Sequence, residues 1–172
     1  MLKFSAALAC AALILTGQPL ATQSLSGRRA PSFSLPDSKL QAHDILDSRG
    51  HWLLLDFMKT DCPHCKELSK KLEGVKNKYG AKVEVLGVVI TPPENQGTVA
   101  KYTAEVKITS AIVFDYGQVA VNYFKATPQN QSFDTPHLFA IDPNGMIVKD
   151  WNQTAVEAPG FLSELDQVLN KK

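Results

Sequence analysis

The chain has 172 residues, a length that suggests one domain. Hydrophobic residues make up 44% of it, charged residues make up 20%, and the formal net charge is +1. This composition excludes an intrinsically disordered chain, and the lack of a basic excess argues against a surface that binds nucleic acid.

The N-terminal region has the features of a secretory signal. Lys3 precedes an apolar run at residues 4–15, which is too short for a membrane span of about 20 residues. We expect residues 1–23 to form a signal peptide. Pro19 fits poorly near a cleavage site after Ala21, so an uncleaved membrane anchor stays open as an alternative.

The mature chain, expected at residues 24–172, holds few cysteines. Cys10 lies within the apolar run, so removal of the signal would leave only Cys62 and Cys65. Two thiols with no spare cysteine suit a two-electron redox couple in an exported protein. The expected location is therefore periplasmic or otherwise extracytoplasmic.

The mature chain alternates predicted strands and helices. Residues 22–30 look like a loose leader, and an extended segment follows at residues 30–37. Strands are expected at residues 51–57, 83–90, 110–114, 138–141 and 146–151. Helices are expected after the cysteine pair, at residues 95–106 and 119–124, and after Pro159, with Leu162, Leu165, Val168 and Leu169 facing inward. This alternation, closed by a hairpin, predicts an α/β fold with helices on both faces of the sheet.

The most informative motif is Cys62-Pro63-His64-Cys65, between a predicted strand and a predicted helix. If Cys62 is the helix N-cap, Pro63 takes the first helical position, where its missing N–H costs nothing. The free N–H groups of the helix N-terminus and the positive charge of His64 would then stabilise the thiolate of Cys62. Cys65 would lie in the first turn, more buried, and is the expected resolving thiol.

Other roles for the cysteine pair fit the sequence less well. A zinc site needs about four ligands, and there is no second Cys-x-x-Cys to supply them. A c-type haem site needs histidine directly after the second cysteine, where Lys66 stands. A structural disulfide in so tight a loop would constrain the unfolded chain little. We therefore expect thiol–disulfide exchange, with no metal and no cofactor.

The motif and its flanks resemble the thioredoxin superfamily, specifically its TlpA/ResA-like (redoxin) branch, over about residues 30–170. One anchor is Asp56-Phe57 ahead of the cysteines, and another is Thr135-Pro136 ahead of the last hairpin. The separation of these anchors leaves room for the extra strand–helix insertion of this branch, at about residues 85–114. The resemblance implies a thioredoxin-like central mixed sheet flanked by helices on both faces, with that insertion.

The resemblance also implies roles for individual residues. Asp56 would be a buried acid that relays protons to the resolving cysteine, although an outward-facing aspartate at a strand edge is an alternative. Pro136 would be a cis-proline beside the disulfide, and Thr135 and Pro136 would bind substrate. Pro63-His64 is the dipeptide of DsbA-type oxidases, whereas Asp61 replaces the tryptophan that family members usually carry before the first cysteine.

The leading functional prediction is an exported thiol–disulfide oxidoreductase that acts on protein substrates as a monomer, together with an upstream redox partner. The Gln- and Asn-rich loop at residues 126–134 is expected to contact partners. One alternative is a peroxiredoxin-like peroxidase, but the Pro-x-x-x-Thr-x-x-Cys pattern of that branch is missing. Another is a copper chaperone that uses Cys62, Cys65 and His137, a soft ligand set. The partner and the direction of electron flow stay open.

Overall fold

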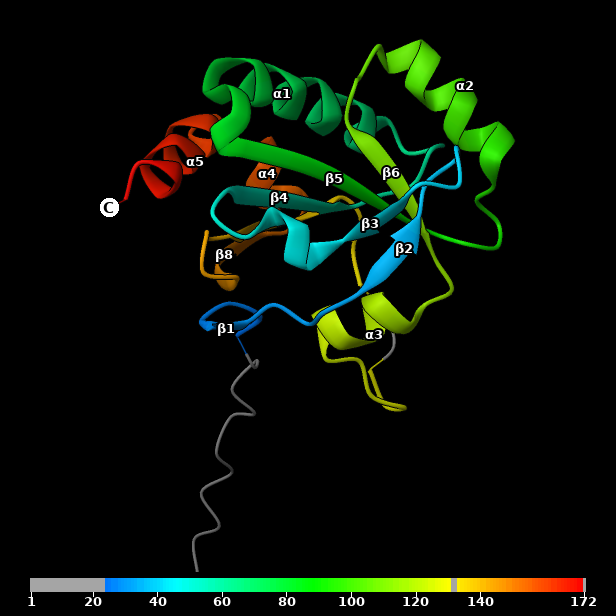
Figure 1. The fold of residues 1–172 in the computed structure, drawn as a ribbon, viewed down its shortest axis with the longest axis horizontal. Coiled ribbons are helices and arrows are strands. Elements are labelled where there is room, and N and C mark those ends of the chain that lie inside the picture. The colour runs from blue at the N-terminus through cyan, green and yellow to red at the C-terminus, as the bar shows by residue number, and fades with distance from the viewer. Residues whose placement is uncertain (1–23, 131–132, 172) are drawn as a thin grey trace, which may run out of the picture.

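The computed structural model describes residues 24–130 and 133–171 (Figure 1). The expected signal peptide at residues 1–23 lies outside the described residues. Within the described ranges, no helix is both long enough and apolar enough to cross a membrane.

A mixed six-stranded sheet forms the centre of the fold (Figure 1). Its strands, in spatial order, are β1 (Arg28–Arg29), β8 (Met146–Trp151), β7 (His137–Ile141), β4 (Trp52–Phe57), β5 (Val83–Ile90) and β6 (Ala111–Asp115). β4, β5 and β6 run parallel, whereas β7 is antiparallel to both β4 and β8, and β1 is antiparallel to β8. A separate hairpin pairs β2 (Ser34–Pro36) with β3 (Ala42–Asp44).

In the part of the chain that the structure describes, five α-helices cover the two faces of this sheet: α1 (Pro63–Tyr79), α2 (Gln96–Val106), α3 (Gln118–Phe124), α4 (Gln153–Glu157) and α5 (Phe161–Leu169). Short 3₁₀ helices lie at Ile45–Ser48 and Gly80–Lys82. Figure 1 shows α3 on the opposite side of the sheet from α1 and α5. The prediction of a thioredoxin-like α/β fold with helices on both faces is confirmed.

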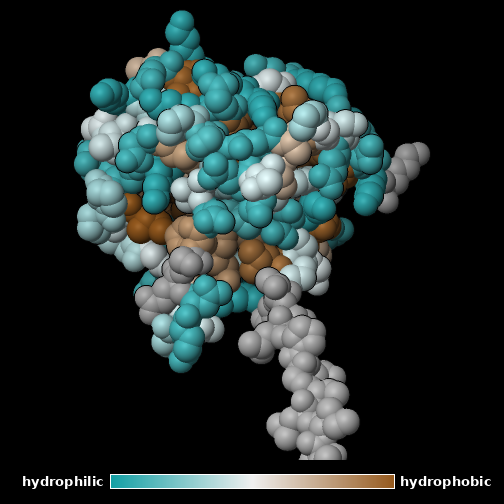
Figure 2. Space-filling model, turned by 180° about the vertical axis from the view of Figure 1, so that it is seen from behind, coloured by the Kyte–Doolittle hydropathy of each residue, from teal (hydrophilic) through white to brown (hydrophobic). Residues whose placement is uncertain are grey.

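The alternation of side chains along β4 divides the core between the two faces. Leu53, Leu55 and Phe57 pack in the cluster that includes α3, and Leu54 packs in the cluster that includes α1 and α5. Asp56 therefore points to the α1 face, because side chains two positions apart share a face of a strand. Figure 2 shows a mainly hydrophilic surface with small apolar patches, as expected when most apolar side chains are buried.

Two sequence expectations are wrong. The leader is not loose at its described end, because Arg28 and Arg29 form β1 along the edge of β8, and Arg28 also packs over the ring of Tyr123. The last helix begins at Phe161, and its buried face carries Phe161, Leu165, Val168 and Leu169, whereas Leu162 is 44% exposed.

Candidate active site

The cysteine pair lies where β4 runs into α1. Cys62 is the N-cap of α1, and its Sγ accepts a hydrogen bond of 3.3 Å from the backbone N–H of Cys65. Pro63 is the first helical residue, so the expected cap geometry is confirmed. Both cysteines are free thiols, and Cys62 is partly exposed whereas Cys65 is fully buried. An attacking substrate can therefore reach Cys62 but not Cys65.

The environment of Cys65 holds its proton. Burial, together with the hydrogen bond to Cys62 and the charge of Asp56, raises the pKa of the Cys65 thiol well above its usual range. The backbone N–H of Lys59 points at this sulfur from 3.5 Å and acts in the other direction. Cys65 consequently needs a base before it can act as a nucleophile.

Asp56 is a buried carboxylic acid whose charge acts on Cys65, so its ionised form is the candidate for this base. It is 2% exposed, and burial raises its pKa to about 8. Among the described residues, its Oδ1 is the single buried side-chain oxygen or nitrogen without a hydrogen-bond partner. The alternative of an outward-facing aspartate at an edge is wrong, because β4 is a central strand between β5 and β7.

Thr135 and Pro136 come next to the exposed thiol from the other side of the site. The Thr135–Pro136 bond is cis, as the resemblance implies, and the carbonyl oxygen of Thr135 lies 3.9 Å from the Sγ of Cys62. A segment distant in sequence is thus placed against the first cysteine.

His64 has a partner that the sequence did not indicate. Its Nδ1 lies 2.5 Å from Oε1 of Glu157 at the end of α4, and both side chains are about half exposed. Glu157 also accepts a hydrogen bond from Gln153. A carboxylate therefore opposes part of the electrostatic effect of His64 on the cysteine pair.

His137, the histidine of the copper alternative, contacts Asp150 and two phenylalanine rings. Nε2 of His137 lies 3.1 Å from Oδ2 of Asp150, and the ring packs against Phe124 and Phe139. Within residues 24–130 and 133–171, no cluster of three or more His, Cys, Asp or Glu side chains could hold a metal ion.

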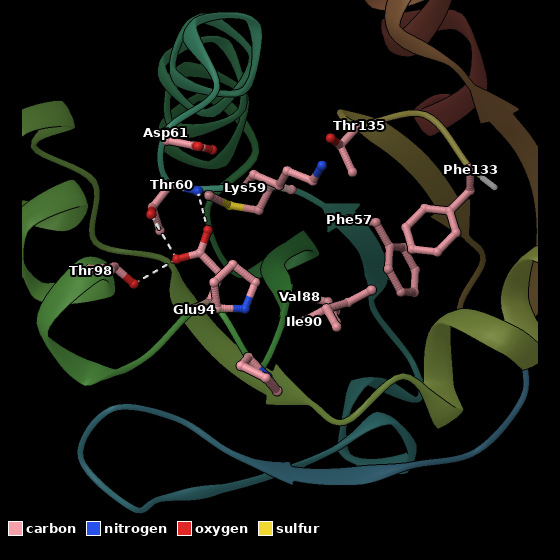
Figure 3. Close-up of a pocket in the computed structure, with 13 residues that line it drawn as sticks. Phe57, Lys59, Thr60, Asp61, Val88, Ile90, Glu94, Thr98, Phe133 and Thr135 are labelled. Atoms are coloured by element: carbon pink, nitrogen blue, oxygen red, sulfur yellow. Dashed lines mark hydrogen bonds between the residues drawn. The ribbon is translucent and has the colours of Figure 1, made fainter. Parts of the chain in front are cut away.

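Glu94 belongs to the site but was missed by sequence reasoning. It is 6% exposed, and its carboxylate accepts hydrogen bonds from the N–H and Oγ1 of Thr60, each 2.7 Å, and from Oγ1 of Thr98 at 2.6 Å. Figure 3 shows these bonds joining the loop before Cys62 to the start of α2. The signal in the sequence was weak, a carboxylate directly before the helix N-cap Asn95.

A pocket of about 510 Å³ opens beside this loop. Thirteen residues line it: Phe57, Met58, Lys59, Thr60, Asp61, Val88, Ile90, Pro92, Pro93, Glu94, Thr98, Phe133 and Thr135. Figure 3 shows Phe57 and Phe133 together on one wall, with Glu94 on the other side. Phe133 stacks on Phe124, with ring centroids 4.3 Å apart. The loop at residues 126–134 thus reaches the site through Phe133.

Replacing Glu94 with glutamine should loosen the loop that carries Cys62. A carboxamide oxygen cannot accept all three hydrogen bonds, so the free energy of unfolding should fall by about 1–3 kcal/mol. Chemical denaturation measures this loss, and the rate of Cys62 alkylation reports the loop. Glu105→Gln, which breaks an exposed ion pair with Lys66, is the control and should change neither quantity appreciably.

The AhpC/TSA family profile matches residues 26–150. The chain belongs to this family. Two relatives place it more closely within the AhpC/TSA proteins. It is 31% identical over 124 residues to the thiol-disulfide oxidoreductase ResA of Geobacillus kaustophilus, covering 70% of this chain and 66% of that protein. It is 25% identical over 122 residues to the thioredoxin-like protein YneN of Bacillus subtilis, covering 70% and 68%.

The fold of this AhpC/TSA member is shared with solved structures. The thioredoxin domain of a thiol-disulfide oxidoreductase from Bacteroides vulgatus superposes with a TM-score of 0.68 at 19% identity, covering 84% of this chain and 98% of that one. The resemblance to the ResA-like redoxin branch is confirmed, and the predicted enzyme class agrees with the names of these relatives. The chain spans about two thirds of the length of the two relatives above.

Proposed function

We propose that this protein is an extracytoplasmic thiol–disulfide oxidoreductase that exchanges electrons with protein substrates through the Cys62–Cys65 couple. The observation that carries the proposal is the pairing of a partly exposed thiol at a helix N-cap with a fully buried one behind it. The names of the ResA relatives support the reaction class, and the apolar N-terminal run supports export.

The reaction runs through a mixed disulfide. The Cys62 thiolate, stabilised by the Cys65 N–H and the helix N-terminus, attacks a substrate disulfide and releases one substrate thiolate. Asp56, in its ionised form, accepts the proton of Cys65. The Cys65 thiolate then attacks Sγ of Cys62, which releases the second substrate sulfur and leaves the Cys62–Cys65 disulfide. The reverse sequence oxidises a substrate dithiol, and a redox partner restores the starting state.

Substrate recognition combines a backbone segment and the pocket. The carbonyl of Thr135 beside Cys62 provides an acceptor for an extended chain that carries the reacting cysteine. The pocket next to it has aromatic and aliphatic walls, including Phe57, Ile90 and Phe133, and would take an apolar side chain close to that cysteine. We include three further residues in the proposed site: Pro63 at the first position of α1, His64 between the two cysteines, and Pro136 after the cis bond to Thr135.

Replacing Phe133 with alanine should weaken substrate binding rather than chemistry. Loss of one aromatic wall should lower kcat/KM by about tenfold for peptide disulfides with an apolar residue beside the cysteine, mainly through KM. Steady-state kinetics on two peptides that differ only at that residue measures the effect. Leu162→Ala, at an exposed apolar position on α5, is the control. An equal loss for both peptides would contradict a side-chain pocket.

One assay set tests the function itself. Reduction of insulin disulfides, or oxidation of a peptide dithiol, should proceed with the wild-type protein and depend on Cys62. Peroxide consumption without a protein substrate would instead indicate the peroxidase alternative. Stoichiometric binding of copper(I) to the reduced protein that requires His137 would indicate the chaperone. Fractionation of cells that express the full chain tests export, and sedimentation tests the monomer.

A further inference from the structure

A small cavity lies against Asp56 between the sheet and α1. Its volume is about 10 Å³, close to the minimum that holds one water molecule. Its walls are mostly apolar, from Met58, Gly87, Ile112 and their neighbours. Three polar side chains interrupt these walls: Asp56, Ser69 and Ser110.

Asp56 is a polar group in need of a partner at this cavity. Nearly all buried polar groups in folded proteins form a hydrogen bond with protein or with an ordered water. The Oδ1 of Asp56 has no such bond to another described residue. A water needs two to four polar partners, and the carboxyl group with the two serine hydroxyls meets that number.

The two serines lead in different directions. The Oγ of Ser69 lies 2.8 Å from the hydroxyl of Tyr102, and both of these side chains are buried in the core. Ser110, directly before β6, is partly exposed, and its Oγ donates to Oε2 of Glu73 at 3.2 Å. Glu73 is on α1 and is partly exposed, and Thr109 also donates to it. Only the Ser110 branch reaches the surface.

We propose that one water molecule in this cavity links Asp56 to Ser110, and that protons pass between Asp56 and solvent through Ser110 and Glu73. The proposal rests on the proposed function, in which each resolution step leaves one proton on Asp56. The water accepts that proton and passes one to the Ser110 hydroxyl, which donates its own proton to Glu73. Glu73 releases it to solvent, and Asp56 is again ionised.

The position of this route explains its use. A bound protein substrate covers Cys62 and Thr135, and so blocks the exit on the cysteine side. The cavity approaches Asp56 from between α1, β5 and β6, so it stays open during the mixed-disulfide stage. The other titratable groups whose charges act here are Cys62 and Cys65 from α1 and Tyr102 from α2 at Asp56, and Lys76 from α1 at Glu73.

Gly87→Ala tests the route by filling the cavity. A Cβ at Gly87 would lie 3.1 Å from Cγ1 of Ile112 and 3.2 Å from Sδ of Met58, two atoms of residues that line it. The matched control is Gly74→Ala on α1, where a Cβ meets nothing within 4 Å. Ser110→Ala removes the relay without adding atoms, and Ser110→Thr keeps the hydroxyl.

Three measurements test the route. Steady-state turnover (kcat) of a substrate disulfide, which requires Asp56 to lose its proton in every cycle, should slow by about tenfold in Gly87→Ala and Ser110→Ala, and should recover in Ser110→Thr. Isotope-edited NMR of the Asp56 carboxyl carbon should show its titration midpoint rise by about one pH unit in Gly87→Ala, because the ionised form loses a hydrogen bond. A crystal structure at high resolution should place a water against Asp56 in the wild type.

Each failure has a distinct meaning. If both variants match Gly74→Ala in rate and titration, or if the cavity contains no water, the route is wrong. If Gly87→Ala does not fold, Ser110→Ala and Ser110→Thr decide by the same rate. If Asp56→Asn itself resolves mixed disulfides at the wild-type rate, the relay in the proposed function fails, whatever the cavity contains.

Discussion

Replacing Cys62 with serine should abolish disulfide exchange, whereas replacing Cys65 with serine should yield a protein that attacks substrates and then stays covalently attached to them. Of the two cysteines among the described residues, Cys62 is the reachable one, and its sulfur is held at the helix N-cap. Cys65 is completely buried, so it acts on Cys62 alone. Without it, the mixed disulfide has no internal nucleophile and persists.

The trapped species should appear as high-mass bands on non-reducing gels, lost on reduction, and mass spectrometry should assign the bond to Cys62. The double variant Cys62→Ser/Cys65→Ser is the control and should trap nothing. Trapping by Cys62→Ser, but not by Cys65→Ser, would reverse the two roles.

Replacing Asp56 with asparagine should stabilise the protein at neutral pH while it impairs resolution. The folded-state pKa of Asp56 is raised to about 8, whereas an aspartate in the unfolded chain titrates near 3.9. Its contribution to stability is therefore complete below about pH 4 and is lost as the pH rises towards 8, by up to about 1.4 kcal/mol per pH unit. Asparagine removes this loss, so the variant should exceed wild type by up to about 4 kcal/mol at pH 7.

Chemical denaturation at several pH values measures this difference, which should shrink towards pH 4. Asp61→Asn, at an exposed position beside the motif, is the control and should stay within about 0.5 kcal/mol of wild type. A variant less stable than wild type at pH 7 would mean that Asp56 forms a stabilising interaction in its ionised state.

The features that the sequence predicted correctly depend on local patterns. The spacing of the cysteines, a proline at the first helical position and an acid inside an apolar strand each fix chemistry within a few residues. Glu94 and Glu157 could not be found this way. Glu94 bonds to Thr60, 34 positions earlier, and Glu157 reaches His64 from α4, a helix that the sequence did not indicate. No short pattern records such pairs.

The same distinction explains the errors in the fold. Continuous apolar runs predicted the central strands, because these strands are buried on both faces of the sheet. The prediction of a loose leader was wrong because β1 forms by pairing with the edge of β8. The sequence of its two arginines does not by itself indicate a strand. The prediction for Leu162 was wrong because Phe161, four positions before Leu165, takes the place on the buried face that Leu162 was expected to fill.

The two-residue strand β1 also bears on self-association. A bare sheet edge offers unpaired backbone groups to any other extended chain, and two such edges invite aggregation. Here the N–H of Gly27 donates to the carbonyl of Ile147, and that of Ala30 donates to the carbonyl of Gly145. The leader thus covers the edge of β8, and Arg28 and Arg29 form the new edge of the sheet. At the opposite edge, Asp37 bridges to Val113 on β6. Both outer strands are thus partly covered, which limits edge-to-edge pairing between copies of this chain.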